Sequence, residues 1–389
     1  MSVKEIVRSA RYRSSVFGSA SGAGVHDAID AMKSRTAATS TLHVFHWDPK
    51  FFPPFLEFLD SEFGLENNPI LLEGAPQDIQ LGTGISVVRP SSGLSRIRQY
   101  WSAMEEASRV ILHGVFDRDL RFALALRPRL ARRCCWVPWG GDLYWATEPA
   151  TSPKRWMHLA LFRRAVRQFS HVLTYLPKDL EVARDHLGFR GAMLPCLMYH
   201  SNVVSDRALT TPIPGEASSS DHLKILVGNS ATPSNLHDDA FEALQPARDR
   251  VEVICPLNYG DPAYREHVIA TGRRLFGGQF RPLVHWMPRA PFEGLLSTID
   301  IGVFAHRRQQ AMGTTIGLLG MGRQVVLRAG TSQANYFGSL GVSYATLDKP
   351  VFDRLHPKVA TRNRALIAEH HSLSTLRDNW RDILRYPAR

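Results

Sequence analysis

The chain of 389 residues has globular proportions, with 44% hydrophobic and 21% charged residues and a formal net charge of +11, and its length suggests two domains. No apolar run reaches the ~18 residues that a membrane-spanning helix needs, and the four cysteines lack the spacing of zinc or redox motifs. No secretory signal is recognisable, so free thiols in a reducing cytoplasm are expected.

Residues 1–40 are rich in Ser, Ala, Gly and Arg and are predicted to be an N-terminal extension outside the main fold. From residue 41 to 209, strands are predicted at 42–47, 70–72, 85–88, 110–113, 134–138, 172–175 and 192–197, and helices at 53–63, 93–107, 120–132, 155–169 and 179–187. This alternation favours a parallel sheet with helices on both faces. Residues 210–221 contain Pro, Gly and Ser without an apolar period and are predicted to be a linker.

The alternation restarts over residues 222–350, with strands predicted at 223–227, 251–255, 283–286, 301–305 and 324–328, and helices at 236–244, 264–276, 292–298 and 313–321. Residues 351–389 are predicted to be C-terminal helices that could cross back to the first domain. Two doubly wound α/β domains in series are therefore expected. Ligands of such sheets bind in the crevice outside the carboxyl ends of the strands.

The basic residues concentrate between Arg118 and Arg190, where fourteen Lys or Arg accompany six Asp or Glu. A field of this sign attracts phosphorylated ligands, anionic lipid headgroups or nucleic acid. A solvated basic face is the simpler interpretation. No nucleic-acid-binding signature accompanies the charge, so nucleic acid is the least favoured partner.

The most informative segment runs from Phe304 to Thr315, where a strand ends and a helix begins. A helix N-terminus offers unpaired N–H groups and a partial positive charge, and Gly313 permits close approach of a ligand to the backbone. These features suit a diphosphate, which Arg307 or Arg308 could bind through a charge-assisted hydrogen bond. In that case Gly313→Asp is expected to abolish donor binding. An ordinary strand-to-helix turn with basic residues facing water fits the same sequence.

A second loop, Gly228-Asn229-Ser230, follows the first strand of the second half. The glycine lets a ligand approach the backbone, and the Asn and Ser side chains can bond a phosphate or a sugar. A plain turn with Ser234 as a helix N-cap explains the same residues. No GxGxxG motif is present, so a nicotinamide or flavin site is not predicted.

In the first half, the segment Trp139-Gly140-Gly141-Asp142, with Tyr144, follows a predicted strand. The glycine pair allows a sharp turn that presents Asp142 to the crevice, where a carboxylate could take the proton of an acceptor hydroxyl. The alternatives are an Asx turn or N-cap for Asp142 and core packing for Trp139 and Tyr144.

Two histidines end neighbouring strands of this half. His113, followed by Gly114, could be a base, a phosphate ligand or the orienter of Asp142, although a lone histidine at a strand end is more often structural. His46 has a similar but weaker claim. No metal site is predicted, so the helix dipole and Arg would stabilise a leaving diphosphate.

Together these segments resemble glycosyltransferase family 56, the 4-acetamido-4,6-dideoxy-D-galactose transferases of enterobacterial common antigen assembly, from about Leu42 to about Val342. The resemblance is carried by Leu112-His113-Gly114, by Trp139-Gly140-x-Asp142-Leu143-Tyr144, by Ile225-Leu226-Val227-Gly228-Asn229-Ser230 with Ser234-Asn235 and His237, by Pro256 and Tyr259, and by Arg308-Gln309-Gln310-x-x-Gly313-Thr314.

The resemblance implies a GT-B fold, with two Rossmann-like domains facing across a cleft. It implies transfer of 4-acetamido-4,6-dideoxygalactose or a similar amino-deoxy sugar from a dTDP-sugar to a polyprenyl-diphosphate-linked saccharide. The enzyme would need no cofactor or metal beyond this nucleotide sugar. It would lie on the inner face of the bacterial cytoplasmic membrane, where the basic first half meets an anionic surface.

The resemblance also implies which residues form the site. The donor would be bound by Gly228, Asn229, Ser230, Pro256, Tyr259, Arg308, Gln309, Gln310, Gly313 and Thr314. The acceptor would be bound by His46, Gly114, Trp139, Gly140, Gly141 and Tyr144, with Asp142 as the preferred base and His113 next.

The chain departs from the family pattern at Ala311, where the family loop has glycine, at residues 1–40 and at Leu283–Phe292. The donor sugar could therefore differ. One alternative is a GT-B enzyme for another exopolysaccharide or O-antigen unit. The other is a non-catalytic basic protein that binds membrane or nucleic acid and tolerates Asp142→Asn and Gly313→Asp.

Overall fold

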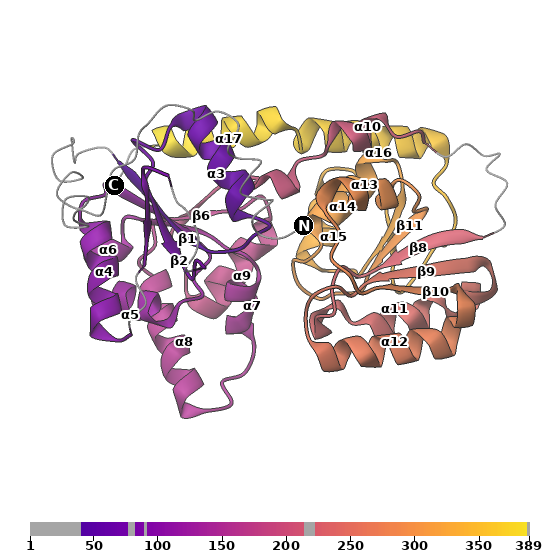
Figure 1. Cartoon of the computed structure of the whole chain (residues 1–389), viewed down its shortest axis with the longest axis horizontal. Coiled ribbons are helices and arrows are strands. Elements are labelled where there is room, and N and C mark those ends of the chain that lie inside the picture. Colours follow the sequence, from indigo (N-terminus) through magenta and orange to yellow (C-terminus); the bar gives the residue numbers. More distant parts are fainter. Residues whose placement is uncertain (1–39, 77–81, 89–91, 214–221, 387–389) are drawn as a thin grey trace, which may run out of the picture. The chain divides into compact units, whose positions relative to one another are not determined.

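The computed structural model describes residues 40–389 except 77–81, 89–91, 214–221 and 387–389. Residues 40–389 belong to one structural unit. Within it lie two parallel β-sheets with helices against both faces of each (Figure 1). The extension predicted over residues 1–39 and the part of the predicted linker from 214 to 221 lie outside the described residues.

The first sheet has the strand order β3-β2-β1-β4-β5-β6-β7. Its strands are β1 (Thr41–His46), β2 (Ile70–Glu73), β3 (Ile85–Val87), β4 (Arg109–His113), β5 (Cys134–Val137), β6 (His171–Leu173) and β7 (Ala192–Leu194). Its helices are α3 (Phe52–Phe63), α4 (Leu94–Glu105), α5 (Arg118–Leu126), α6 (Pro128–Ala131), α7 (Gly141–Tyr144), α8 (Pro153–Val166) and α9 (Pro177–Leu187). The central strands β4 and β5 are buried at every residue, as expected for a parallel sheet covered on both faces.

The second sheet has the strand order β10-β9-β8-β11-β12-β13. Its strands are β8 (Leu223–Val227), β9 (Val251–Pro256), β10 (Phe280–Leu283), β11 (Ile301–Phe304), β12 (Gln324–Leu327) and β13 (Ala345–Thr346). The helices of this half are α11 (His237–Leu244), α12 (Pro262–Phe276), α13 (Arg289–Leu296), α14 (Met312–Gly320), α15 (Ser332–Ser339) and α16 (Pro357–His370). In Figure 1, α11 and α12 lie on one face of the sheet and α13 to α16 on the other.

Successive residues of each strand point to opposite faces, and this alternation separates the hydrophobic cores. Val110 and Leu112 of β4 pack under α4, α5 and α8, while Ile111 between them packs toward α3 on the other face. The core on the α3 side continues into the second half, where it includes Leu226 of β8 and Ile316 of α14. The two halves therefore share one hydrophobic core on this side.

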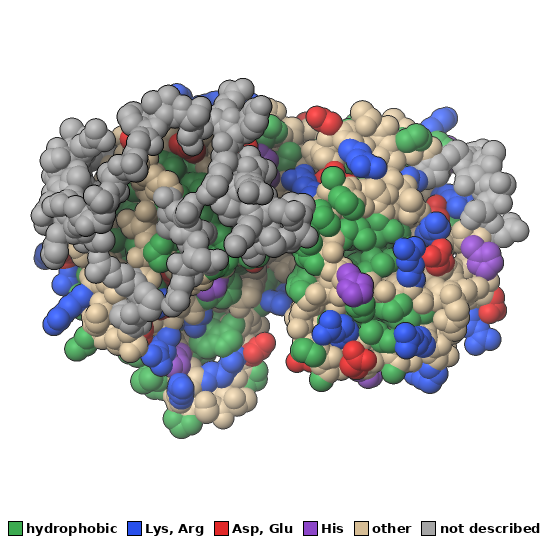
Figure 2. Space-filling model, in the orientation of Figure 1, with side chains coloured by type: hydrophobic (Ala, Val, Ile, Leu, Met, Phe, Trp, Pro, Cys, Tyr) green, Lys and Arg blue, Asp and Glu red, His purple; other side chains and the backbone are tan. Residues whose placement is uncertain are grey.

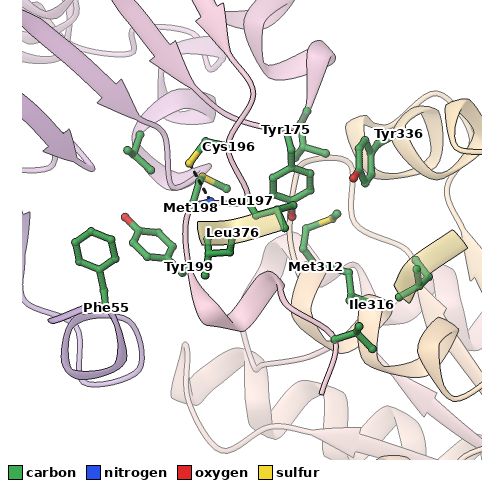
Figure 3. Packing of buried hydrophobic residues seen from close by; sticks show 14 of the residues in the cluster. Phe55, Tyr175, Cys196, Leu197, Met198, Tyr199, Met312, Ile316, Tyr336 and Leu376 are labelled. Carbon is green, nitrogen blue, oxygen red and sulfur yellow. Dashed lines mark hydrogen bonds between the residues drawn. The ribbon is translucent and has the colours of Figure 1, made fainter. Parts of the chain in front are cut away.

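The connection between the halves passes through that shared core. Figure 3 shows the segment around Leu197 between Phe55 on one side and Met312 and Ile316 on the other. The segment then leads into α10 (Asp206–Thr210), whose N-terminus Ser205 caps through its hydroxyl.

The final helix, α17 (Leu373–Arg385), returns to the first half. The Trp380 indole donates a hydrogen bond to the Met198 carbonyl at 3.0 Å, and the Asn379 side chain accepts one from the Leu197 amide at 2.9 Å. At the surface, Arg377 binds both carboxylate oxygens of Glu62 on α3, at 2.6 and 2.8 Å. This helix thereby fixes the connecting segment against the first sheet.

The structure departs from the sequence predictions at a few elements. The helix predicted at 120–132 is broken at Arg127, because Pro128 disfavours a helical conformation at the residue before it. The strand predicted at 283–286 lies at β10 (Phe280–Leu283) instead, because Phe280 enters the core whereas Trp286 is exposed. The short elements α7, α15 and β13 were not predicted. None of the helices in the described ranges is long and apolar enough to span a bilayer.

Candidate active site

Each sheet has one place where the chain reverses its direction of travel across the sheet. In the first sheet the chain passes from β1 to β2 on one side and later to β4 on the other, and in the second it passes from β8 to β9 and later to β11. The carboxyl ends of β1 and β4, and of β8 and β11, therefore flank the two topological switch points, where open α/β sheets bind ligands. His46 and His113 end strands at the first switch point, and the loops at Gly228 and Arg308 follow strands at the second.

Five side chains at the second switch point form one hydrogen-bonded network, which we call the β8–β11 network. The Asn229 amide donates to the Tyr259 hydroxyl at 3.0 Å and accepts from the Gln310 amide at 3.0 Å. Gln310 in turn accepts from the Ser234 hydroxyl at 2.8 Å, and Ser234 accepts from the Arg308 guanidinium at 3.0 Å. The network thus contains four residues of the expected donor site. Tyr259, Asn229 and Gln310 are bonded in sequence, and Ser234 links Gln310 to Arg308.

The loop beneath this network has little freedom to change. The Asn235 side chain accepts a hydrogen bond from the backbone amide of Asn229 and donates to the Ser230 carbonyl and hydroxyl, at 2.9 and 3.0 Å. Gly228 has φ +66°, and a Cβ there would lie 2.8 Å from His237 Nε2 and 3.0 Å from the Asn235 side chain. Ser230 is 1% exposed, so its hydroxyl shapes the loop rather than facing a ligand. Gly228 is needed for the tight packing of this turn.

Helix α14 begins beside the network. Its N-cap residue Ala311 has φ +56°, a left-handed conformation that costs a residue with a Cβ about 1–2 kcal/mol. A chain of buried hydrogen bonds supports this turn. Gln333 Oε1 accepts from His306 Nε2 at 2.7 Å, and the Gln333 amide donates to the Thr315 hydroxyl at 2.5 Å. The Thr315 hydroxyl in turn donates to the Ala311 carbonyl at 3.1 Å. The turn presents the first N–H groups of α14 beside Gln310.

Gly313 packs closely against the segment that connects the two halves. A Cβ at Gly313 would overlap the backbone carbonyl oxygen of Ser201, in the segment that connects the halves. The glycine is therefore required by the packing of α14 on this segment, whatever binds at the helix N-terminus. That Gly313→Asp abolishes donor binding stays a prediction; in addition, any side chain at this position would meet the Ser201 carbonyl.

The other expected donor residues are placed as follows. Pro256 is the buried last residue of β9, Thr314 is half-buried in the first turn of α14, and Arg307 is exposed. Gln309 lies against the first half: a Cβ at Gly140, which has φ +77°, would lie 3.1 Å from the Gln309 carbonyl oxygen. Gly140 therefore permits close approach of the loops that follow β5 and β11.

Asp142 is fully buried, and its carboxylate is occupied by the surrounding loop. Oδ2 accepts from the Val115 amide at 2.9 Å and the Trp136 indole at 2.8 Å, and Oδ1 accepts from the Trp139 amide at 2.8 Å. Burial raises the pKa of Asp142, while these hydrogen bonds and Arg121 oppose the rise. This geometry suits a residue that fixes the loops after β4 and β5 better than one that takes a proton from an acceptor.

His113 belongs to a buried polar chain inside the first half. Its Nδ1 lies 2.8 Å from the Tyr199 hydroxyl and its Nε2 lies 2.9 Å from His43 Nδ1, and Tyr199 also accepts from the Trp139 indole at 2.7 Å. Burial lowers the pKa of His113 well below its usual value and that of His43 to about 3. With both ring nitrogens occupied and no exposed surface, His113 orients Tyr199 rather than Asp142.

His46 is the expected acceptor-side histidine that reaches the surface, with 39% of its side chain exposed. Its ring lies 5.3 Å from that of Phe116 and 6.5 Å from that of Trp139. Trp139 also packs edge-on against Tyr199 and beside Phe51. Gly114, at φ +75°, and Gly141 lie against the Phe116 ring. Aromatic rings therefore surround the exposed imidazole.

A second contact between the halves centres on Tyr144. Its hydroxyl donates to Asp179 Oδ1 at 2.8 Å and lies 2.6 Å from the Ser332 hydroxyl, which also donates to Asp179 at 2.9 Å. Asp179 lies in the first turn of α9, and Ser332 lies in the first turn of α15. Burial raises the pKa of Asp179 to about 6. Sequence reasoning placed Tyr144 on the acceptor but missed its two partners.

No group of three His, Cys, Asp or Glu side chains with metal-binding geometry occurs within the described ranges. The chain has a single Asp-x-Asp sequence, Asp117 to Asp119. Asp117 is the N-cap of α5, accepting from the Asp119 and Leu120 amides, and it pairs with Arg96 at 2.7 Å. The four cysteines are free and buried.

Comparison with known proteins places this architecture. A family model described as 4-alpha-L-fucosyltransferase glycosyl transferase group 56 matches residues 87–386. Sucrose-phosphate synthase from Thermosynechococcus elongatus is 9% identical over 89% of this chain and 98% of its own, with a TM-score of 0.59. Anabaena HepE, solved in complex with UDP and glucose, is 12% identical over 89% of this chain and 99% of its own, with a TM-score of 0.58. WaaG, a glycosyltransferase involved in lipopolysaccharide biosynthesis, is 13% identical over 89% and 100%, with a TM-score of 0.53.

At these identities the likeness to solved structures shows the fold, which is GT-B as the sequence predicts. The family match covers most of the chain, from β3 to the end of α17. The protein is therefore a GT-B glycosyltransferase and belongs to glycosyltransferase family 56.

Proposed function

We propose that this glycosyltransferase moves 4-acetamido-4,6-dideoxygalactose, or a closely related amino-deoxy sugar, from a dTDP-sugar to a polyprenyl-diphosphate-linked saccharide. The transfer takes place at the inner face of the bacterial cytoplasmic membrane. The β8–β11 network carries the proposal, because it gathers polar side chains and a helix N-terminus at the switch point of one sheet.

The nucleotide diphosphate binds at this network. The first turn of α14 supplies N–H groups and the positive end of the helix dipole, and Arg308 supplies a charge within hydrogen-bonding distance of the same loop. Arg308 is half-buried, and burial lowers its pKa, which still leaves the guanidinium charged. Its Nε has no hydrogen-bond partner among the described residues, so it can bind a phosphate oxygen.

The choice of sugar is supported by the family description and by the resemblance described above. The family description names a fucosyltransferase, and 4-acetamido-4,6-dideoxygalactose shares the 6-deoxygalactose skeleton with fucose. The competing candidate is a UDP-sugar donor for another surface polysaccharide, since Anabaena HepE was solved with UDP and glucose on the same fold. Both candidates place the diphosphate at α14, and they differ in the base and the sugar.

A lipid-linked acceptor requires that the first half reach a membrane. The start of α8 exposes Trp156 and Met157, at 65% and 42%, beside the exposed Lys154. Positive charges gather there. The pKa of His158 is lowered first by desolvation and then by the charges of Arg118 and Lys154. Figure 2 shows blue and green side chains together over this end of the first half. Exposed Trp beside basic residues suits the interface of an anionic bilayer.

The donor is tested by calorimetry and turnover. We expect dTDP to bind more tightly than UDP, and transfer from dTDP-4-acetamido-4,6-dideoxygalactose to a short-chain polyprenyl-diphosphate saccharide. Tighter binding of UDP, with transfer from a UDP-sugar, would select the competing candidate. Absence of binding by either nucleotide and of any transfer would refute the proposal.

The membrane surface is tested by sedimentation with vesicles of phosphatidylglycerol and phosphatidylcholine. We expect Trp156→Ala and Lys154→Glu each to weaken binding to anionic vesicles, and salt to weaken the wild type. Arg250→Glu, at an exposed pair in the second half, serves as the control and should bind as the wild type does. Equal binding to purely zwitterionic vesicles would contradict the electrostatic part.

A further inference from the structure

His46 and Glu73 form a polar pair at the first switch point. His46 ends β1, and Glu73 ends the neighbouring β2, so that the two residues are paired across the sheet. His46 Nδ1 lies 3.7 Å from Glu73 Oε2, and this nitrogen is buried. The His46 side chain is 39% exposed, and its other ring nitrogen, Nε2, is not among the buried atoms that lack a partner.

Glu73 is a buried carboxylate that lacks the usual partners. It is 1% exposed, and neither of its oxygens has a hydrogen-bond partner within the described ranges. The Tyr100 hydroxyl is the other polar group that acts on it, and Arg96 and Asp117 lie at the edge of this cluster. A buried carboxylate without hydrogen bonds is costly. A positively charged imidazole at His46 therefore stabilises the Glu73 carboxylate strongly.

The pair also lies in the right place for chemistry. His46 leads directly into the loop that contains Asp48, and the charge of Asp48 acts on the pKa of Tyr259, a member of the β8–β11 network. Contacts between the loops point the same way: the ring of Trp139 lies beside His46, and a Cβ at the next residue, Gly140, would lie 3.1 Å from the carbonyl oxygen of Gln309, the neighbour of Gln310 in the network. The rings of Phe116 and Trp139 beside His46 offer apolar faces of the kind on which sugar rings pack.

We infer that His46 is the general base of the transfer and that Glu73 is the residue that positions it; the inference rests on the proposed function. The acceptor hydroxyl oxygen attacks the anomeric carbon of the donor sugar. The bond from that carbon to the diphosphate oxygen breaks, and its electron pair leaves with the nucleotide diphosphate. The hydroxyl proton passes to His46 Nε2, and the imidazolium is stabilised by the Glu73 carboxylate behind it. Such a step inverts the configuration at the anomeric carbon.

The other carboxylates and imidazoles of this region are less suited to that step. Asp142 and His113 have no exposed surface, and their polar atoms are occupied. Asp48 Oδ1 accepts from the Lys50 and Phe51 amides and so stabilises the loop before α3. Asp48 is the strongest rival, because it is half-buried and lies two residues after His46 in the same loop.

The pH dependence distinguishes His46 from this rival. The pKa of His46 is raised, chiefly by Glu73, with Asp117 and Asp48 adding to the rise and desolvation opposing it. A base must be neutral to accept a proton, so kcat/KM should fall as the pH drops through this raised pKa. Removing the Glu73 charge should lower the pKa of His46 and move the acid limb to lower pH, although the pair titrates as a coupled system.

The test uses the full-length enzyme with the dTDP-sugar and the short-chain polyprenyl-diphosphate saccharide. His46→Ala should lower kcat by about 10²- to 10⁴-fold, leave the affinity for dTDP unchanged and remove the acid limb, and added imidazole should restore part of the rate. His267→Asn is the matched control, because His267 forms an exposed pair with Asp238 at 2.8 Å and belongs to α12 in the second half, not to the first half that contains His46. It should keep the wild-type rate and pH profile.

Glu73→Gln tests the positioning role. It should lower kcat by about tenfold or more and shift the acid limb to lower pH, with KM changed little. Titration of the histidine ¹⁵N resonances, with and without Glu73→Gln, should show the same shift without any substrate. If Glu73→Gln does not fold, His46→Ala and its rescue by imidazole decide the matter.

The outcomes separate this inference from the proposed function. If the wild type binds dTDP and transfers the sugar but His46→Ala keeps its rate and acid limb, the inference is overturned and the proposed function stands. Loss of the acid limb in Asp48→Asn, with the limb retained in His46→Ala, overturns it equally. A retained configuration at the anomeric carbon also contradicts it. If the wild type neither binds dTDP nor transfers the sugar, it is the proposed function that fails, and the ¹⁵N titration still reports on the pair.

Discussion

Polar side chains gather at both switch points, but the two sheets arrange them differently. At the second sheet, the partly exposed side chains of Asn229 and Gln310 are bonded to each other, and also to Tyr259 and Ser234 respectively. At the first, His113 and Asp142 are buried with every polar atom occupied, and His46 is the histidine that reaches the surface. Exposed amides can exchange their partners for a ligand at small cost, whereas buried ones cannot. This difference supports our proposals that the second sheet recognises the nucleotide and that His46 of the first sheet accepts the proton.

The largest expected effect tests whether Asp142 is structural. In Asp142→Asn, an NH₂ group replaces one carboxylate oxygen. In one orientation it faces the Trp139 amide, and in the other it faces the Val115 amide and the Trp136 indole, so a donor meets a donor in either case. We expect a loss of about 3 kcal/mol in the free energy of unfolding, measured with urea. Wild-type stability together with lost activity would instead support Asp142 as the base.

The next effect tests the second switch point. Arg308→Ala removes a charge-assisted contact and should weaken dTDP binding by about 10- to 100-fold, as measured by calorimetry. Arg307→Ala is the matched control, because Arg307 is the exposed neighbour, and its effect should stay below about threefold. Similar losses in both variants would mean that only the overall charge matters.

Gly313→Ala tests the contact between α14 and the connecting segment. The new Cβ meets the Ser201 carbonyl, so we expect a loss of about 1–3 kcal/mol in stability. Gly317→Ala in the same helix meets only Leu296, at 3.6 Å, and should stabilise the protein by about 0.5–1 kcal/mol. Equal effects at the two glycines would contradict the contact with Ser201.

Asp179→Asn tests the buried contact between the halves through its pH dependence. Because the pKa of Asp179 is raised from 3.8 to about 6, the folded state favours its protonated form, and the stability falls as pH rises through this window. Asn stays neutral and keeps an oxygen for Tyr144 and Ser332. The variant should therefore be more stable by about 1–3 kcal/mol near pH 8 and lose this advantage near pH 4. A pH-independent difference in thermal unfolding would count against the raised pKa.

Ala311→Gly should have the smallest effect. Glycine adopts the left-handed conformation of residue 311 without strain but loses more entropy on folding, so a gain of about 0.5–1 kcal/mol in stability is expected. Thermal unfolding would measure it, and a destabilised variant would contradict the conformation.

The alternation of strands and helices predicted the fold because both sheets are parallel and buried, so that each strand is an apolar run and each crossover a helix. Asn229, Arg308 and Gln310 of the β8–β11 network could be singled out because they directly follow β8 and β11, whereas Tyr259 came from the family resemblance and Ser234 was considered only as a helix N-cap. The partners of Tyr144 were not predictable, because Asp179 and Ser332 lie 153 residues apart and no local pattern joins them. The burial of Asp142 and His113 was also hidden, because a strand end can face the core or the solvent. Glu73 left one signal, a carboxylate that closes the apolar strand Ile70–Glu73.

The central claim is that a dTDP-sugar binds at the switch point of the second sheet. A crystal structure of the full-length protein with dTDP tests it most directly. The account predicts the diphosphate at the first turn of α14, within hydrogen-bonding distance of Arg308, with Asn229 or Gln310 turned toward the nucleotide. A nucleotide bound at the first sheet, or one that leaves the β8–β11 network untouched, would contradict the account.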